Sequence, residues 1–232
     1  MSPLTIWPVE GLPEIRAGAA LAQLIAERTD LRRGDVVVVT SKVVSKSEGR
    51  VVEIDADDPE AKLRLAEAEA VRVLRRRGEL VITETHHGFV CASSGVDLSN
   101  VEEGYAVLLP LDADRSARRL RDGLRAASGV EVAVVVTDTF GRPWRRGLTD
   151  VAIGVAGVAA VADLRGLPDA LGRTLTVTEV AVADEIAAAA DLVMGKSAGI
   201  PAAVVRGVEP SFLRSSSVAA ELVRPPAEDL FR

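Results

Sequence analysis

The residues with the clearest capacity for chemistry are Asp138 and the two threonines beside it. They follow residues 132–136, a continuous apolar and mostly β-branched run that predicts a strand buried on both faces. Because a buried strand gains nothing from a desolvated carboxylate, Asp138 is predicted to lie at the end of that strand. Three arginines follow, Arg142, Arg145 and Arg146. Oxygen ligands beside guanidinium groups suit a metal ion that faces a phosphate, although the same Thr-Asp-Thr sequence would equally cap a turn.

A second polar cluster follows residues 36–39, which predict another buried strand. It contains Ser41 and Lys46, with further hydroxyls and a second lysine. Hydroxyl donors and positive charge at the end of a strand are suited to binding phosphate. The sequence has no G-x-x-x-x-G-K-[ST] pattern, so this cluster is not a P-loop. Solvated lysines after a strand are the simpler interpretation of the cluster taken alone.

The third cluster lies at residues 95–100 and includes Asp97 and Asn100. Their spacing of three residues is typical of an Asx turn or a helix cap. In the functional interpretation, Asp97 supplies a second metal carboxylate and Asn100 contacts a nucleotide. Two acids from separate strands, together with hydroxyl groups, would form a Mg²⁺ or Mn²⁺ site, because both ions prefer oxygen ligands.

The composition limits the class of protein. Of the 232 residues, 48% are apolar and 27% are charged, which is typical of a globular protein. An aromatic content of 3% and a net charge of −6 argue against binding to nucleic acid in general. Cys91 is the only cysteine, so an intrachain disulfide and a Cys-rich zinc site are excluded. No apolar run reaches membrane-spanning length and no signal peptide is evident, so we expect a cytoplasmic protein without a membrane partner.

The elements that must position these clusters follow from the hydrophobic pattern. Helices are predicted at residues 17–29, 59–77, 114–127 and 183–193, and strands at 36–39, 80–82, 89–92, 106–109, 132–136, 174–182 and 202–205. Residues 151–164 are almost entirely Val, Ala, Ile and Gly. Gly154 and Gly157 would let a helix there pack closely against another backbone. The chain length of 232 residues allows one large domain or a domain with a second lobe.

Several motifs together resemble the coenzyme F420-0:L-glutamate ligase family. They are Gly11-Leu12-Pro13-Glu14 and residues 38–46, 95–100, 137–142 and 178–185, in the order and spacing of that family. The likeness covers nearly the whole chain and is closest to the N-terminal ligase domain of the actinobacterial two-domain enzymes. It implies an α+β fold with mixed sheets and packed helices, in a two-lobed, intertwined dimer. It also implies one ligase domain over residues 1–232, with 151–164 at an interface and without the flavin-binding domain of the two-domain relatives.

The resemblance implies GTP-dependent ligation of L-glutamate to F420-0 through an acyl phosphate, releasing GDP and phosphate, with further γ-linked glutamates added in later rounds. The ions would be Mg²⁺ or Mn²⁺ at two sites, with K⁺ as an additional candidate, and the small-molecule partners GTP, L-glutamate and F420-0. Residue by residue, GTP would be bound by Leu12, Pro13, Glu14, Ile15, Ser41, Lys46 and Asn100, and metal by Asp97, Asp138 and Thr139. Catalysis would involve Asp138 and Lys46. We add Arg142 as a candidate for stabilising transferred charge. The loop at residues 196–199 matches part of the family's nucleotide site, but it diverges more than the other motifs.

Two other functions remain open on the sequence. A metal-dependent nucleotide phosphohydrolase would use the same two carboxylates with a bound water, and it would release phosphate from GTP without an acceptor. A GTP-sensing or purely structural dimer would show no turnover.

Overall fold

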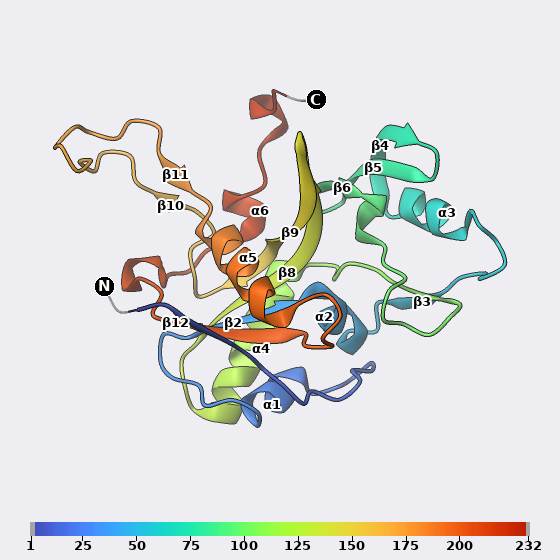
Figure 1. Ribbon diagram of the computed structural model, residues 1–232, viewed down its shortest axis with the longest axis horizontal. Helices are drawn as coiled ribbons and strands as arrows, with labels where there is room; N and C mark the ends of the chain where they lie inside the picture. Colours follow the sequence, from blue (N-terminus) through green and yellow to red (C-terminus); the bar gives the residue numbers. More distant parts are fainter. Residues whose placement is uncertain (1–2, 231–232) are drawn as a thin grey trace.

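The computed structural model describes residues 3–230, and a five-stranded sheet forms its centre (Figure 1). Its strand order is β1 (Thr5–Pro8), β12 (Ala202–Arg206), β2 (Val36–Thr40), β8 (Ala133–Arg142) and β9 (Arg145–Ala156). Only β2 and β8 run parallel, and every other neighbouring pair is antiparallel. The predicted α+β class with mixed sheets is therefore confirmed.

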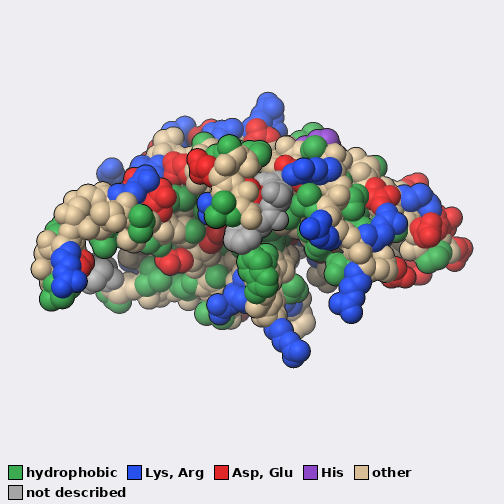
Figure 2. Space-filling model, turned by 90° about the horizontal axis from the view of Figure 1, so that it is seen from above, with side chains coloured by type: hydrophobic (Ala, Val, Ile, Leu, Met, Phe, Trp, Pro, Cys, Tyr) green, Lys and Arg blue, Asp and Glu red, His purple; other side chains and the backbone are tan. Residues whose placement is uncertain are grey.

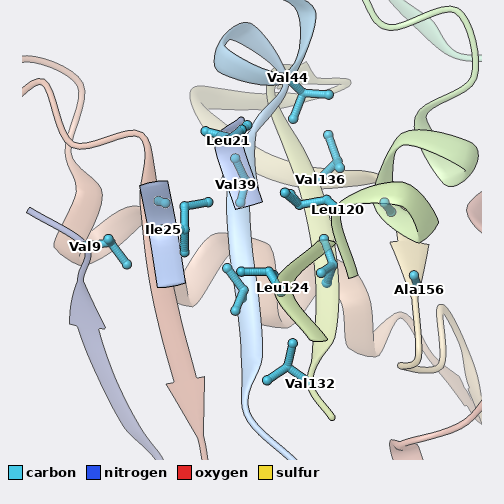
Figure 3. Packing of buried hydrophobic residues seen from close by; sticks show 14 of the residues in the cluster. Val9, Leu21, Ile25, Val39, Val44, Leu120, Leu124, Val132, Val136 and Ala156 are labelled. Carbon is cyan, nitrogen blue, oxygen red and sulfur yellow. The ribbon is translucent and has the colours of Figure 1, made fainter. Parts of the chain in front are cut away.

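Both faces of the central sheet are covered, which explains its continuous apolar strands. Val37 and Val39 of β2 face the helices α1 (Leu21–Ala26) and α4 (Ala113–Ser128), whereas Val36 and Val38 face α5 (Val182–Met194). Successive side chains of a strand point to opposite faces. A strand between two helical layers must therefore be apolar at every position. Figure 3 shows the first of these cores, where Leu21, Ile25, Leu120 and Leu124 pack against the sheet.

A smaller region extends from the carboxyl end of β2. It contains α2 (Ser41–Ser47), β3 (Val51–Glu53), α3 (Ala61–Ala68), β4 (Ala70–Arg77), β5 (Leu80–Thr85), β6 (Val90–Ala92), the 3₁₀ turn η1 (Ser93–Gly95) and β7 (Tyr105–Val107). Strands β4, β5 and β6 form an antiparallel sheet, and β3 pairs with β7. Val81, Val96 and Leu108 are among the residues of its own small core.

The remaining elements complete the chain. They are β10 (Ala162–Asp163), β11 (Glu179–Val180), α6 (Val218–Glu221) and the 3₁₀ turns η2 (Pro210–Phe212) and η3 (Pro226–Glu228). In the described residues, no helix combines the length and the apolar character needed to cross a membrane.

The helices predicted at 114–127 and 183–193 and the strands at 36–39, 132–136 and 202–205 are confirmed. The prediction of one helix over 59–77 is wrong, because the helix ends at Ala68 and β4 follows. Most of β4 is exposed, so no burial pattern marks it in the sequence. The predicted strand 174–182 is also largely wrong. Only Glu179–Val180 is a strand, and α5 already begins at Val182.

Residues 151–156 belong to strand β9 and not to a helix, which corrects the interpretation of the Gly/Ala-rich segment. The close packing predicted for Gly154 is nevertheless present, since a Cβ atom there would lie 2.3 Å from the carbonyl carbon and oxygen of Ala113 in α4. The small residue lets the sheet and this helix approach one another.

We expect Gly154→Ala to lower the free energy of unfolding by about 3 kcal/mol, because the added methyl group meets backbone that cannot rotate away. Urea unfolding followed by far-UV circular dichroism measures this change. Gly141→Ala is the matched control, since a Cβ at Gly141 would meet nothing within 4 Å. Equal effects of the two substitutions would contradict the assigned contact.

Candidate active site

The first site residues meet where β2 and β8 run side by side. Thr40 is in register with Thr137, and α2 begins directly after Thr40 with Ser41. The Ser41 hydroxyl, which is buried, donates a hydrogen bond of 2.8 Å to Oδ1 of Asp138. Because the two strands are parallel, their carboxyl ends share one edge of the sheet. Two residues that are 97 positions apart in the sequence therefore come into contact.

Asp138 does not end its strand, contrary to the sequence prediction. Strand β8 continues to Arg142 because β9 pairs with it along the whole hairpin. The apolar run stops where helices no longer cover both faces: Thr137 is fully buried and Asp138 only partly so. A register shift between Val136 and Thr137 marks this boundary, and such irregularities redirect the side chains that follow.

The electrostatic surroundings of Asp138 are unusual for an aspartate. Burial of its carboxyl group, together with the nearby carboxylates of Asp150 and Asp97, raises its pKa to about 6, even though hydrogen bonds from Ser41 and the Thr139 backbone act in the opposite direction. The carboxylate of Asp138 thus lies close enough to those of Asp150 and Asp97 to be repelled by both. Such a cluster favours a bound cation or a proton.

This pKa gives a pH prediction. The raised value, against an ordinary 3.8, means that the folded state keeps a proton on Asp138 that the unfolded chain has lost between about pH 4 and 6. The contribution of Asp138 to the free energy of unfolding therefore falls as pH rises through that range and is constant above it. The melting temperature of Asp138→Asn minus that of the unsubstituted protein is therefore expected to increase as the pH rises from 4.5 to 7. Thermal unfolding in EDTA-containing buffer measures this difference. A difference in melting temperature that does not change with pH would contradict this prediction.

Asp97 lies in the predicted Asx turn, since its Oδ1 accepts a hydrogen bond of 2.8 Å from the backbone N–H of Ser99. The ammonium of Lys42 lies 2.7 Å from Asp97 Oδ2 and donates to the Ser99 hydroxyl. Burial opposes the charge of Asp97, but the hydrogen bonds from Lys42 and Ser99 hold its pKa below the ordinary value. The Lys42 partner was not predicted from the sequence.

Lys46 is the centre of a second group, at the other end of α2. Its buried ammonium lies 2.5 Å from Oε1 of Glu14 and 2.7 Å from the carbonyl oxygen of Asn100. Glu14, Ile15, Lys46 and Asn100 line one cavity of about 660 Å³. The family resemblance implied that all four contact the nucleotide, and the fold places them together although they come from three separate segments. The other lining residues are Arg16, Ala17, Gly49, Val51, Val101, Glu102 and Tyr105.

The remaining predicted nucleotide contacts lie outside the lining of this cavity. Leu12 packs against the main hydrophobic core and Pro13 is exposed. Ser41 is engaged with Asp138 instead. Because α2 rises about 1.5 Å per residue, Ser41 and Lys46 are separated by roughly 8 Å along the helix. One short helix therefore connects the Asp138 group with the cavity.

The buried carboxylate of Asp150 is a site residue that sequence reasoning missed. Residue Thr139 pairs with Asp150 across the hairpin, and its hydroxyl donates to Asp150 Oδ1 at 2.6 Å. Lys196, in the loop after α5, places its ammonium 2.6 Å from the same oxygen and 2.5 Å from the Thr139 hydroxyl. Burial works against the positive charge, but Asp150 and Asp191 raise the pKa of Lys196 above its ordinary value. The loop at 196–199 thus reaches the predicted metal residue Thr139. The one sequence signal for Asp150 is an acid directly before an apolar run, whereas Asp138 comes just after one.

Among the described residues, no hydrogen bond or ion pair joins Arg142 to Asp138. It lies four residues further along β8, or roughly 13 Å for an extended strand. Its side chain is exposed, and its guanidinium donates a 3.4 Å hydrogen bond to the carbonyl oxygen of Arg146.

The chemistry of the donors fits a hard divalent cation, but the described residues do not form a complete cage. Carboxylate and hydroxyl oxygens are contributed by Asp97, Asp138 and Thr139. Among residues 3–230 there is no group of three or more His, Cys, Asp or Glu side chains arranged to hold a metal. Lysines also pair with Asp97 and Asp150. A Mg²⁺ ion here would complete its shell with water and substrate phosphates, as this ion commonly does.

Comparisons with known proteins match this chain over almost its full length. The family model described as F420-0:Gamma-glutamyl ligase matches residues 11–207, which include every candidate site residue above. The chain is 43% identical to a coenzyme F420:L-glutamate ligase of Methanopyrus kandleri, over 99% of this chain and 98% of that protein. The identity is 41% to the protein of that name from Methanothermobacter thermautotrophicus, with 97% of both chains covered. For the Archaeoglobus fulgidus protein it is 42%, over 98% of this chain and 96% of that one. These similarities show that the chain is an enzyme of the F420-0:gamma-glutamyl ligase family.

Proposed function

We propose that this enzyme uses GTP to join L-glutamate to coenzyme F420-0, and then to join further γ-linked glutamates to the product. The observation that carries the proposal is the similarity, over nearly the full length, to relatives named coenzyme F420:L-glutamate ligase. The site supports it, because a cavity lined by Lys46 lies one short helix away from the Ser41–Asp138 pair.

The proposed chemistry has two steps. A carboxylate oxygen of the acceptor attacks the γ-phosphorus of GTP, the bond to the β-phosphate oxygen breaks, and GDP leaves. The amine nitrogen of glutamate then attacks the carbonyl carbon of the acyl phosphate. The carbon–oxygen bond to phosphate breaks, the nitrogen loses a proton, and an amide and inorganic phosphate result. The first step gives the otherwise unreactive carboxylate a leaving group, and it needs neutralisation of phosphate charge more than a covalent catalyst.

Each candidate residue has a role in this proposal. Lys46, held by Glu14 and Asn100, places positive charge in the nucleotide cavity. Asp97, Asp138 and Thr139 would hold Mg²⁺ or Mn²⁺, which neutralises phosphate charge when bound. Ser41 fixes the orientation of the Asp138 carboxylate through its hydrogen bond. Arg142 remains a predicted contributor to the stabilisation of transferred charge. A homodimer, K⁺ as an additional ion and a cytoplasmic location also belong to the proposal.

Mass spectrometry tests the proposed reaction. The enzyme is incubated with F420-0, GTP, Mn²⁺ and L-glutamate, and we expect products heavier by one or more glutamyl units. Parallel reactions lack either glutamate or F420-0. Phosphate release from GTP at the full rate without acceptor, with no heavier product in the complete mixture, would instead identify a nucleotide phosphohydrolase.

A further inference from the structure

The hairpin between β8 and β9 ends in a basic tip, which we define as residues 142–148. Arg142, Arg145 and Arg146 are all exposed there. Within residues 3–230, no carboxylate lies within ion-pair distance of these three guanidinium groups. Some arginines elsewhere in the described residues are paired, such as Arg206 with Asp35. In a chain with a net charge of −6, such a group of unneutralised arginines is a local site for anions.

Trp144 lies at the turn of the same tip in an unfavourable conformation. It follows Pro143, its φ is +58°, and it is 83% exposed. A turn with Pro at its second position usually has Gly or Asn next, because other residues are strained at positive φ. Trp and Arg are the residue types that contribute most to binding when they lie at a surface.

The tip is connected directly to the candidate active site. The hairpin leaves the central sheet at Thr139 and Asp150, which are paired across it. In Figure 1 it projects from the body as a long ribbon between the β4–β5–β6 sheet and the carboxyl-terminal segment. Figure 2 looks onto the end from which this ribbon projects. Several basic side chains lie right of the centre of this face, and acidic ones lie both left of the centre and at the right-hand end.

We propose that the hairpin tip binds the carboxylates of the glutamyl chain on the acceptor substrate. The inference rests on the proposed function, in which each reaction cycle converts one carboxylate to an amide and adds the two carboxylates of glutamate, so that the product carries one more carboxylate. Arg142 lies about 10 Å along the strand from Thr139, a span that an extended chain of roughly three residues covers. A guanidinium group binds a carboxylate through two parallel hydrogen bonds. The Trp144 ring would pack against the methylene groups between these charges.

Steady-state kinetics with acceptors of defined glutamate number test the proposal. We expect Arg145→Gln/Arg146→Gln to raise KM about tenfold for an acceptor that already carries several glutamates, with kcat within about twofold. The increase in KM should grow with the number of glutamates. Arg33→Gln is the matched control, because Arg33 is exposed beside Gly34 at the opposite end of β2. It should leave both constants unchanged.

Trp144→Gly separates binding from folding. Glycine adopts positive φ without strain, so we expect an unchanged or higher melting temperature together with a raised KM for the glutamylated acceptor. An unchanged KM in both hairpin variants would overturn the proposal. A dimer-to-monomer change in light scattering with unchanged KM would also overturn it, and would identify the tip as a subunit interface. If the unsubstituted enzyme forms no glutamylated product, the proposed function itself has failed, which is a distinct result.

Discussion

Asp138→Asn is expected to lower kcat for ligation by about 10²- to 10³-fold, the scale seen when one group that stabilises transition-state charge is removed. The side chain keeps its shape, and Ser41 can still donate its hydrogen bond to the amide oxygen. What is lost is the negative charge that would hold a divalent cation beside the phosphates. The rate of product formation at saturating GTP, Mn²⁺, F420-0 and L-glutamate measures this kcat.

A folding defect would not explain this loss, because neutralising a carboxylate whose pKa is already raised by burial removes an unfavourable charge. Asp35→Asn is a matched control for the loss of a buried aspartate charge. Asp35 is also a buried aspartate, but it pairs with Arg206 at the far end of β2. Its loss should reduce stability and leave turnover per folded molecule unchanged. Full turnover of Asp138→Asn would remove Asp138 from the mechanism.

Lys46→Met should weaken GTP binding by about 2 kcal/mol, or roughly 30-fold in Kd, because a buried ammonium that would face the phosphates is lost. The apolar part of the side chain is retained, so packing changes little. Isothermal titration calorimetry with GTP and Mn²⁺ measures the affinity.

The stability of the Lys46 variant should change much less than its affinity. Its partner Glu14 has a side chain that is 67% exposed, so water can solvate that carboxylate when the lysine is absent. Lys62→Met in helix α3 is a control for the loss of one positive charge away from the cavity. A Kd for GTP within twofold of the original would exclude Lys46 from the nucleotide site.

Both predictions depend on helix α2, which spans only seven residues. Its first residue, Ser41, orients Asp138, and Lys46 in its last turn faces the cavity. Val44, between them, is buried in the main core and fixes the helix against the sheet. The cavity lined by Lys46 and the carboxylate of Asp138 are therefore held at a constant separation by a core contact. A substitution that shortened Val44 would be expected to loosen both at once.

The sequence determined the central strands because both of their faces are buried. The runs at 36–39 and 132–136 had to be apolar at every position, so Ser41 and Asp138 stood out where those runs stopped. The same reasoning could not identify β4, whose exposed residues are under no constraint from a core. It also misjudged residues 151–156, since an apolar run without polar alternation is compatible with a helix or a buried strand.

Only the tertiary structure decided which charged groups meet. Lys42 reaches Asp97 across 55 residues of sequence, and Lys196 reaches Asp150 across 46. Long side chains from separate loops carry no periodic signal, because their partners depend on how strands pair and not on local spacing. The pairing of β8 with β9 placed Asp150 opposite Thr139 and carried Arg142 away from Asp138 into the exposed tip. The sequence by itself thus determined which strand ends carry the chemistry, and the fold decided which charges neutralise one another there.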